Sequence, residues 1–155
     1  MLKNLDNRLN AEVLYALRAM GHGDTLVIAD TNFPSDSIAR QTVLGELLRM
    51  DHLTCAEAVE AVLSVLPLDT FVDDFAGRME VVGAPDKIEP VQAEVQAKIN
   101  AAEGRVREMI SIERFDFYDR AREAYAVIQT GERRFYGCFI LRKGVIPPDA
   151  VGSVH

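Results

Sequence analysis

Apolar side chains recur at helical spacing near the start of the chain and predict a helix over residues 11–20. Asn10 stands where its side chain can accept a hydrogen bond from the first turn of that helix. Gly21 follows the helix, and we expect it to end the helix in a left-handed conformation. The apolar stripe of this helix consists of Val13, Leu14, Leu17 and Met20.

Three further helices are indicated by their ends and their composition. Thr54 and Glu57 form a capping-box pattern before an apolar stripe that a proline stops. A more polar helix is expected over residues 91–102, with Gly104 at its end. A short helix is expected over residues 115–124.

Short apolar runs between the helices predict β-strands. Thr25–Ala29 is the clearest, because turn-forming aspartates stand on both sides of it. Other strands are expected over residues 46–50, 107–112, 125–129 and 138–141, with an extended piece near 79–82. This alternation predicts a layered α/β fold, with one domain over residues 1–148 and a C-terminal tail over 149–155.

The composition excludes several classes of partner. The 155 residues carry a net charge of −7, which argues against a nucleic-acid surface and against docking on anionic lipid. The chain has neither a signal-peptide pattern nor an apolar run of membrane-spanning length. Cys55 and Cys138 are far apart and are read as reduced thiols. We therefore expect a soluble cytoplasmic protein whose partners are neutral small molecules or other proteins.

A histidine between two glycines is the most unusual local feature. Imidazole is the side chain that exchanges protons near neutral pH, and His22 lies on a sharp turn with little side chain around it. The segment can also be a capping turn with an incidental histidine. A zinc site would need about four N or S ligands, which one suitable histidine and two distant cysteines do not supply, so no metal is expected.

Asp30 follows the clearest strand directly, where α/β sheets usually place ligand groups. Its carboxylate could accept hydrogen bonds from sugar hydroxyls. An extended chain would put His22 and Asp30 up to roughly 25 Å apart. They can share one pocket only if the glycine turn folds back, or if neighbouring subunits bring copies together. Asp24, in contrast, is interpreted as a turn residue.

Aromatic and charged residues mix near residue 115. Arg114 could donate a fork of hydrogen bonds to a polar ligand, and Phe115 or Phe117 could form an apolar wall for a sugar. The same residues also fit a core phenylalanine pair with a solvated charged face. Tyr136 and Gly137, entering the last strand, offer a phenol and a close backbone approach.

Four segments together resemble the ribose pyranase / L-fucose mutarotase family, and its fucose branch in particular. They span nearly the whole chain in order and include the Gly-His-Gly-Asp, Asn-Phe-Pro, Arg-Phe-Asp-Phe-Tyr and Thr-Gly-Glu elements. The segments are LYALRAMGHGDTLVIADTNFP (14–34), LPLDTF (66–71), IERFDFYDRAREAYAVIQTGE (112–132) and YGCFILRKGV (136–145).

The resemblance implies a cofactor-independent mutarotase, an isomerase that exchanges the α and β anomers of a free sugar. It implies a mixed sheet flanked by helices and a homo-oligomer, a decameric ring with sites near subunit contacts. By this resemblance His22 is the catalytic proton donor. The substrate-binding residues that it implies are Asp30, Arg114, Tyr118, Tyr136, Gly137 and Cys138.

Cys138 departs from the family pattern, because the fucose branch usually has asparagine there. A thiol donates and accepts hydrogen bonds weakly, whereas an amide does both well. The change predicts a loss of roughly 0.5–1.5 kcal/mol of binding free energy, or a change in the hydroxyl that is accepted. It keeps open a second reading, a non-catalytic monosaccharide-binding regulator. A third hypothesis, that the chain is a purely structural subunit of an assembly, would explain a ring but not the glycine-flanked histidine.

Overall fold

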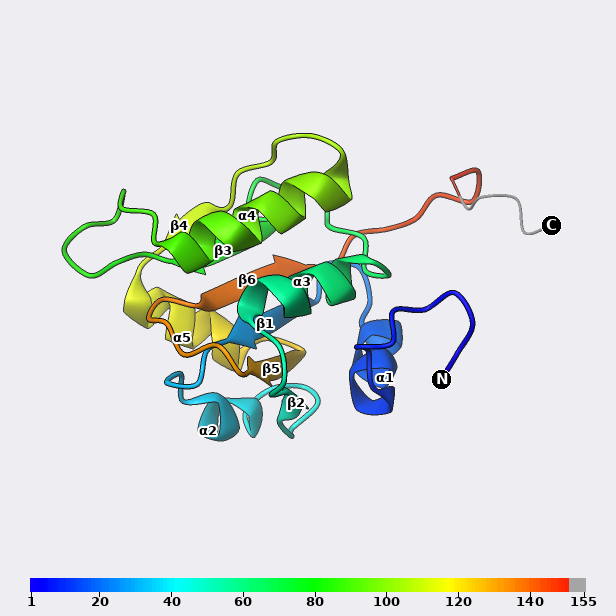
Figure 1. The fold of residues 1–155 in the computed structure, drawn as a ribbon, viewed down its shortest axis with the longest axis horizontal. Coiled ribbons are helices and arrows are strands. Elements are labelled where there is room, and N and C mark those ends of the chain that lie inside the picture. The colour runs from blue at the N-terminus through cyan, green and yellow to red at the C-terminus, as the bar shows by residue number, and fades with distance from the viewer. Residues whose placement is uncertain (151–155) are drawn as a thin grey trace.

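The computed structural model describes residues 1–150 and contains a six-stranded mixed sheet (Figure 1). Its strands lie in the order β2-β5-β1-β6-β3-β4, with β1 parallel to β5 and antiparallel to β6. Strands from the beginning and the end of the chain therefore meet at the centre. The strands are β1 (Thr25–Ala29), β2 (Leu48–Met50), β3 (Ala76–Met79), β4 (Ile110–Ile112), β5 (Ala126–Thr130) and β6 (Cys138–Arg142).

Helices cover both faces of the sheet (Figure 1). Two of them, α3 and α4, pack on one face, and α2 and α5 pack on the other, while α1 joins the same core cluster as α3. This arrangement confirms the expected α/β fold with a mixed sheet between helices. The helices are α1 (Ala11–Ala19), α2 (Ser35–Ala39), α3 (Cys55–Leu63), α4 (Pro90–Glu103) and α5 (Arg114–Arg122).

Strand β1 lies at the centre of the core. Leu26 and Ile28 belong to the apolar cluster on the α3 side, and Val27 and Ala29 belong to the cluster on the α5 side. All four side chains are fully buried. A strand buried on both faces needs apolar residues at every position, which explains the uninterrupted run that marked it in the sequence.

The helix-capping predictions are confirmed at three positions. The side chain of Asn10 accepts a hydrogen bond from the N–H of Val13 at 2.9 Å, and Thr54 accepts one from Glu57. Gly104 closes α4 in the left-handed conformation, with φ 68°. These contacts satisfy backbone groups that a helix end leaves unpaired.

The prediction for Gly21 is wrong. Helix α1 ends at Ala19, and the extended backbone of the cap residue Met20 (ψ 140°) leads the chain away before any left-handed residue is reached. The left-handed glycine of this turn is Gly23, with φ 88°. Asp24 is confirmed as a turn residue, because its carboxylate accepts a hydrogen bond from the N–H of Gly21 at 2.7 Å.

Two other segments differ from expectation. The extended piece expected near residues 79–82 lies earlier, at Ala76–Met79, and a glycine and an arginine in it hide the strand pattern. Gly77 is needed there because a Cβ atom would collide with Ile112 of the neighbouring strand. Helix α2 was not expected, since five residues are too few to show helical periodicity.

The remaining expected elements form, with ends shifted by up to three residues. Among residues 1–150, no helix is long and apolar enough to cross a membrane. The division into a domain over residues 1–148 and a tail stays a prediction, because residues 151–155 lie outside the described part of the chain.

Candidate functional site

The predicted site residues gather at opposite ends of strand β1. His22 precedes the strand and Asp30 follows it, and five extended residues alone span about 16 Å. The glycine turn does not fold back toward Asp30. Instead, the N–H of Gly23 donates to the carbonyl of Lys143, beyond the far end of β6. Each end is therefore described separately.

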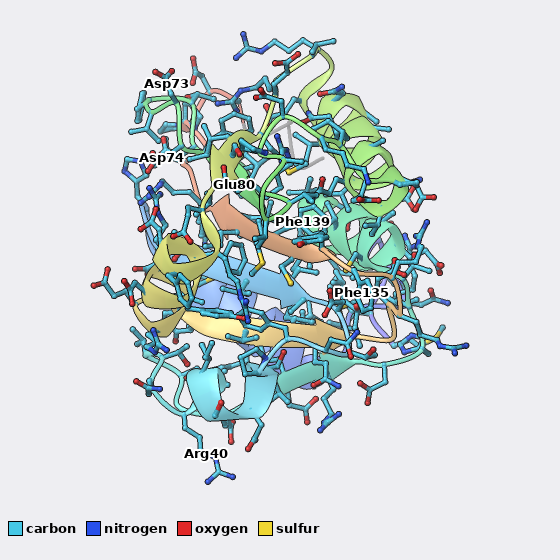
Figure 2. The ribbon with its side chains drawn as sticks, turned by 90° about the vertical axis from the view of Figure 1, so that its left-hand side faces the viewer. Arg40, Asp73, Asp74, Glu80, Phe135 and Phe139 are labelled. Carbon is cyan, nitrogen blue, oxygen red and sulfur yellow. The ribbon has the colours of Figure 1, made fainter. Side chains whose placement is uncertain are left out.

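A cavity of about 280 Å³ lies at the Asp30 end, and one of its lining residues, Phe135, is labelled in Figure 2. It combines charged and hydroxyl-bearing groups with apolar side chains, as sites for small polar ligands do. Five of the six predicted substrate-binding residues line it; Gly137 does not. The lining consists of Asp30, Asn32, Phe33, Met79, Val82, Arg114, Tyr118, Phe135, Tyr136 and Cys138.

Asp30 is buried and saturated with hydrogen bonds. Its Oδ1 accepts from the N–H groups of Asn32 and Phe33, at 2.9 and 3.0 Å. Its Oδ2 accepts from the N–H of Gly137 at 3.1 Å and faces the thiol of Cys138 at 3.6 Å. Burial raises the pKa of Asp30, and the three N–H donors oppose that rise. The thiol is the weakest of the four partners, so Oδ2 is the oxygen that a ligand hydroxyl can reach most easily.

Arg114 and Tyr118 lie one turn apart at the start of α5. The carboxylate of Glu113 caps this helix by accepting the N–H groups of Phe115 and Asp116. This cap fixes the first turn, and the Nε of Arg114 donates to the hydroxyl of Tyr118 at 3.2 Å. The pair therefore presents a cation and a phenol together at the cavity.

Tyr136 adopts a left-handed backbone conformation, with φ 63°, which is uncommon outside glycine. Three contacts hold this segment. The amide of Gln92 donates to the Tyr136 carbonyl, the N–H of Val82 donates to the Tyr136 hydroxyl, and Gly137 donates to Asp30. A hydroxyl that accepts from Val82 keeps its own proton free for a ligand.

Gly137 lies where the chain passes too close to its neighbours to carry a side chain. A Cβ atom at this position would lie 3.1–3.3 Å from Glu132, Asp30 and Cys55, which is too close on three sides at once. The next residue, Cys138, is buried, and desolvation raises the pKa of its thiol well above the ordinary value. The thiol is therefore neutral and acts only as a weak hydrogen-bonding group.

His22 lies on the other end of β1, beside a buried carboxylate. Its Nε2 is 3.2 Å from Oδ2 of Asp69, and its ring meets the edge of Phe71 with centroids 5.5 Å apart. Asp69 is held by the N–H of Phe71 on its Oδ1 and by Arg107 on its carbonyl. The N–H of Phe71 and the nearby imidazole keep the pKa of Asp69 below its usual range.

The His22 turn itself is fastened to the end of β6. Arg142 donates to the carbonyl of Gly23 at 3.0 Å and forms an ion pair with Asp74. Lys143 donates to the carbonyls of Leu17 and Met20 at the end of α1. The imidazole is half-exposed, with 44% of its side-chain area accessible, while the backbone that carries it is fixed.

Sequence reasoning missed several residues of both ends. Asp69 lies 47 residues from His22, although it belongs to one of the recognised motifs, the segment 66–71. The apolar wall of the cavity is not formed by Phe115 or Phe117, the two residues for which the sequence left that role open. Phe117 is buried in the core and Phe115 is exposed, and neither lines the cavity. The wall consists of Phe33, Met79, Val82 and Phe135.

The comparison with family models decides the classification. The RbsD / FucU transport protein family matches residues 3–146. The chain belongs to this family. Fucose mutarotase of Homo sapiens is 46% identical to it over 149 residues, which cover 94% of each chain. The resemblance identified from the motifs is thereby confirmed.

Solved structures of the family have the same fold. The crystal structure of protein Atu2016 is 66% identical, with a TM-score of 0.93, and the match covers 95% of this chain and 97% of that one. Fucose mutarotase from Streptococcus pneumoniae, solved in complex with L-fucose, is 34% identical. Its TM-score is 0.84, with 94% of this chain and 100% of that chain covered.

Proposed function

We propose that this chain is a mutarotase that exchanges the α and β anomers of a free monosaccharide, L-fucose or a similar sugar. The observation that carries the proposal is the division of the site. One end of β1 presents an imidazole paired with a buried carboxylate, and the other presents a polar cavity to which residues 1–150 contribute no imidazole. Its relatives named fucose mutarotase support the same chemistry.

Anomer exchange opens a hemiacetal to the aldehyde and closes it on the other face. Opening requires a proton on the ring oxygen and removal of the proton from the anomeric hydroxyl. His22 donates the first proton. Its Nε2 is engaged by Asp69, which leaves Nδ1 as the ring nitrogen that donates the proton. General acid–base help of this kind is worth about 10²–10⁴-fold, which suits a reaction that proceeds slowly in water.

The cavity residues hold the sugar. Arg114 and Tyr118 donate to its hydroxyls, Tyr136 donates through its free proton, and Oδ2 of Asp30 accepts one hydroxyl in place of the thiol of Cys138. A water, or a tyrosine hydroxyl that passes its own proton on to water, takes the proton from the anomeric oxygen, and solvent returns the proton that His22 gave. This chemistry needs neither a metal nor a cofactor.

A complete site requires two copies of the chain, because no chain can bend β1 to bring its own ends together. His22 of one copy reaches the Asp30 cavity of the next. Such a contact joins different surfaces on the two partners, and it closes into a ring when the rotation between copies permits. A decamer is the assembly that the family resemblance implies. The unpaired, buried Cys55 and Cys138 support action in the reducing cytoplasm.

Saturation-transfer NMR on the anomeric protons of L-fucose, D-ribose and D-galactose tests the reaction. Protein-dependent exchange of one sugar establishes mutarotation and identifies the substrate together. Line broadening without faster exchange would favour the alternative function, a monosaccharide-binding regulator. The weak thiol of Cys138 at Oδ2 of Asp30 is the observation that favours this alternative.

Complementation tests the shared site. His22→Ala and Arg114→Ala chains, each inactive alone, are co-expressed with different tags and purified as a mixed assembly. A contact is intact when the copy that supplies His22 carries the Arg114→Ala change and the copy that supplies the cavity carries the His22→Ala change. Random mixing makes one contact in four of this kind, so the mixed assembly should regain about a quarter of wild-type activity. An inactive mixed assembly would place both residues in one chain's site and refute the shared arrangement.

A further inference from the structure

Phe135 is an exposed aromatic residue at the mouth of the Asp30 cavity. Its accessible fraction is 73%, and its side chain forms part of the cavity lining. Figure 2 labels it. Several other apolar side chains are equally exposed, but Phe135 also lines the cavity, so a ligand bound there would cover its ring and gain the free energy of that burial.

The backbone around Phe135 is held firmly on both sides. Before it, Arg134 forms ion pairs with the buried Glu132 and with Glu94 of α4. After it, Tyr136 is fixed in its left-handed conformation by contacts with Gln92 and Val82. The exposure of the ring is therefore a property of the folded structure rather than of a loose loop.

The lining of the cavity that Phe135 borders combines polar and apolar side chains. Asp30, Arg114 and Tyr118 supply charge and hydroxyl groups, while Phe33, Met79 and Val82 add apolar surface to that of Phe135. A sugar ring likewise carries both polar hydroxyl groups and apolar C–H groups. In the galacto configuration the axial C4 hydroxyl leaves C3–H, C4–H and C5–H on one face. A 6-deoxy sugar adds a methyl group beside them.

We propose that Phe135 is the aromatic platform on which the apolar face of the sugar stacks, and that it sets the preference for a 6-deoxy galacto-configured sugar. The C–H groups carry partial positive charge and meet the negative face of the ring. This inference rests on the proposed function for its substrate class. Its contribution is to binding, because the C3–C5 face is the same in both anomers and carries none of the bonds that break.

Tyr15 of α1 provides a matched control. It is an aromatic residue exposed to a similar degree, 64%, and it does not line the cavity. Replacing either ring by alanine removes an exposed aromatic group, so a general surface effect should appear in both variants.

The experiment measures Kd, KM and kcat for L-fucose and for 6-deoxy-L-glucose, in which the C4 hydroxyl is equatorial and the apolar face is broken. Phe135→Ala should raise Kd and KM for L-fucose about 3- to 10-fold with kcat within about twofold. The increase for 6-deoxy-L-glucose should be smaller. Phe135→Tyr should resemble the wild type, and Tyr15→Ala should leave all three constants unchanged.

Unchanged L-fucose binding in Phe135→Ala would overturn the inference, and so would an equal loss in Tyr15→Ala. A lower molar mass of the Phe135→Ala assembly by light scattering would also overturn it, because the ring would then pack between copies. Failure of the proposed function is distinguishable. A wild-type protein that binds L-fucose without accelerating exchange refutes mutarotation, and the Kd of Phe135→Ala still decides the role of the ring.

Discussion

The two ends of strand β1 are built on different principles. At the Asp30 end the key carboxylate is buried, and protein donors occupy all of its acceptor positions. At the His22 end the imidazole is half-exposed and has one polar side-chain contact, with Asp69. A binding surface must hold many groups in register, whereas a proton donor needs an oriented ring and freedom to meet its substrate. The difference predicts that mutations at the two ends fail in different ways.

The largest expected effect is the loss of catalysis in His22→Ala. Anomer exchange should fall at least about 100-fold, because the proton donor is removed. The melting temperature should stay close to wild type, since the side chain is largely outside the core. Saturation-transfer NMR and thermal denaturation measure the two quantities. Full activity in this variant would contradict the assignment of His22.

Replacing the partner of His22 should have the next largest effect. Asp69→Asn keeps the shape of the side chain but removes the charge that orients the imidazole, and kcat should fall about 10- to 100-fold with little change in KM. Asp73→Asn is the control, because Asp73 is exposed on the same loop (Figure 2). An Asp69→Asn enzyme as active as Asp73→Asn would show that the carboxylate does not orient the ring.

At the opposite end, Asp30→Asn should damage stability as well as binding. An amide has one acceptor oxygen, so N–H donors of Asn32, Phe33 or Gly137 lose their partner, at a cost of about 1–3 kcal/mol in the free energy of unfolding. Urea denaturation measures this cost. Asp36→Asn, on the exposed face of α2, should cost much less.

The same variant has a defined pH dependence. Burial raises the pKa of Asp30 in the folded protein, so the folded state holds this proton more tightly than the unfolded chain. Its contribution to the free energy of unfolding is therefore lost as the pH rises from about 4 through the raised folded value. The stability gap between wild type and Asp30→Asn should narrow over that range. A gap that widens would contradict the burial effect.

The smallest effect is expected for Cys138→Asn. An amide next to Asp30 can donate to Oδ2 and accept from a sugar hydroxyl, so KM for L-fucose should fall about 2- to 10-fold. Cys138→Ala separates loss of the thiol from gain of the amide and should not show this improvement. If both variants bind L-fucose as the wild type does, the position does not contact the sugar.

Short sequence patterns correctly predicted the features that depend only on residues near each other in the chain, namely helix caps and the central strand. Asn10 and Thr54 cap their helices as the spacing indicated, and the apolar run of Thr25–Ala29 forms the central strand. Helix α2 was not predicted, because the five residues Ser35–Ala39 are too few to show a helical pattern. Strand β3 was predicted at the wrong place, because Gly77 has low strand propensity and is required there by its close contact with Ile112.

The site was predictable only in part, for a physical reason. The motifs indicated which residues matter, and five of the predicted binding residues line one cavity. The pairing of His22 with Asp69 depends on where a loop 47 residues away is placed by the end of β6. Phe135 carries no pattern at all, because an exposed aromatic residue is recognised only after the surrounding surface is known.

The separation of His22 and Asp30 along β1 has a consequence for counting active sites. If each site forms where one chain meets the next, an isolated chain has none, an open row has one fewer than its chains, and a closed ring has as many as its chains. Specific activity should then depend on protein concentration. Dilution below the dissociation constant of the assembly should abolish the activity of every chain, although each chain remains correctly folded.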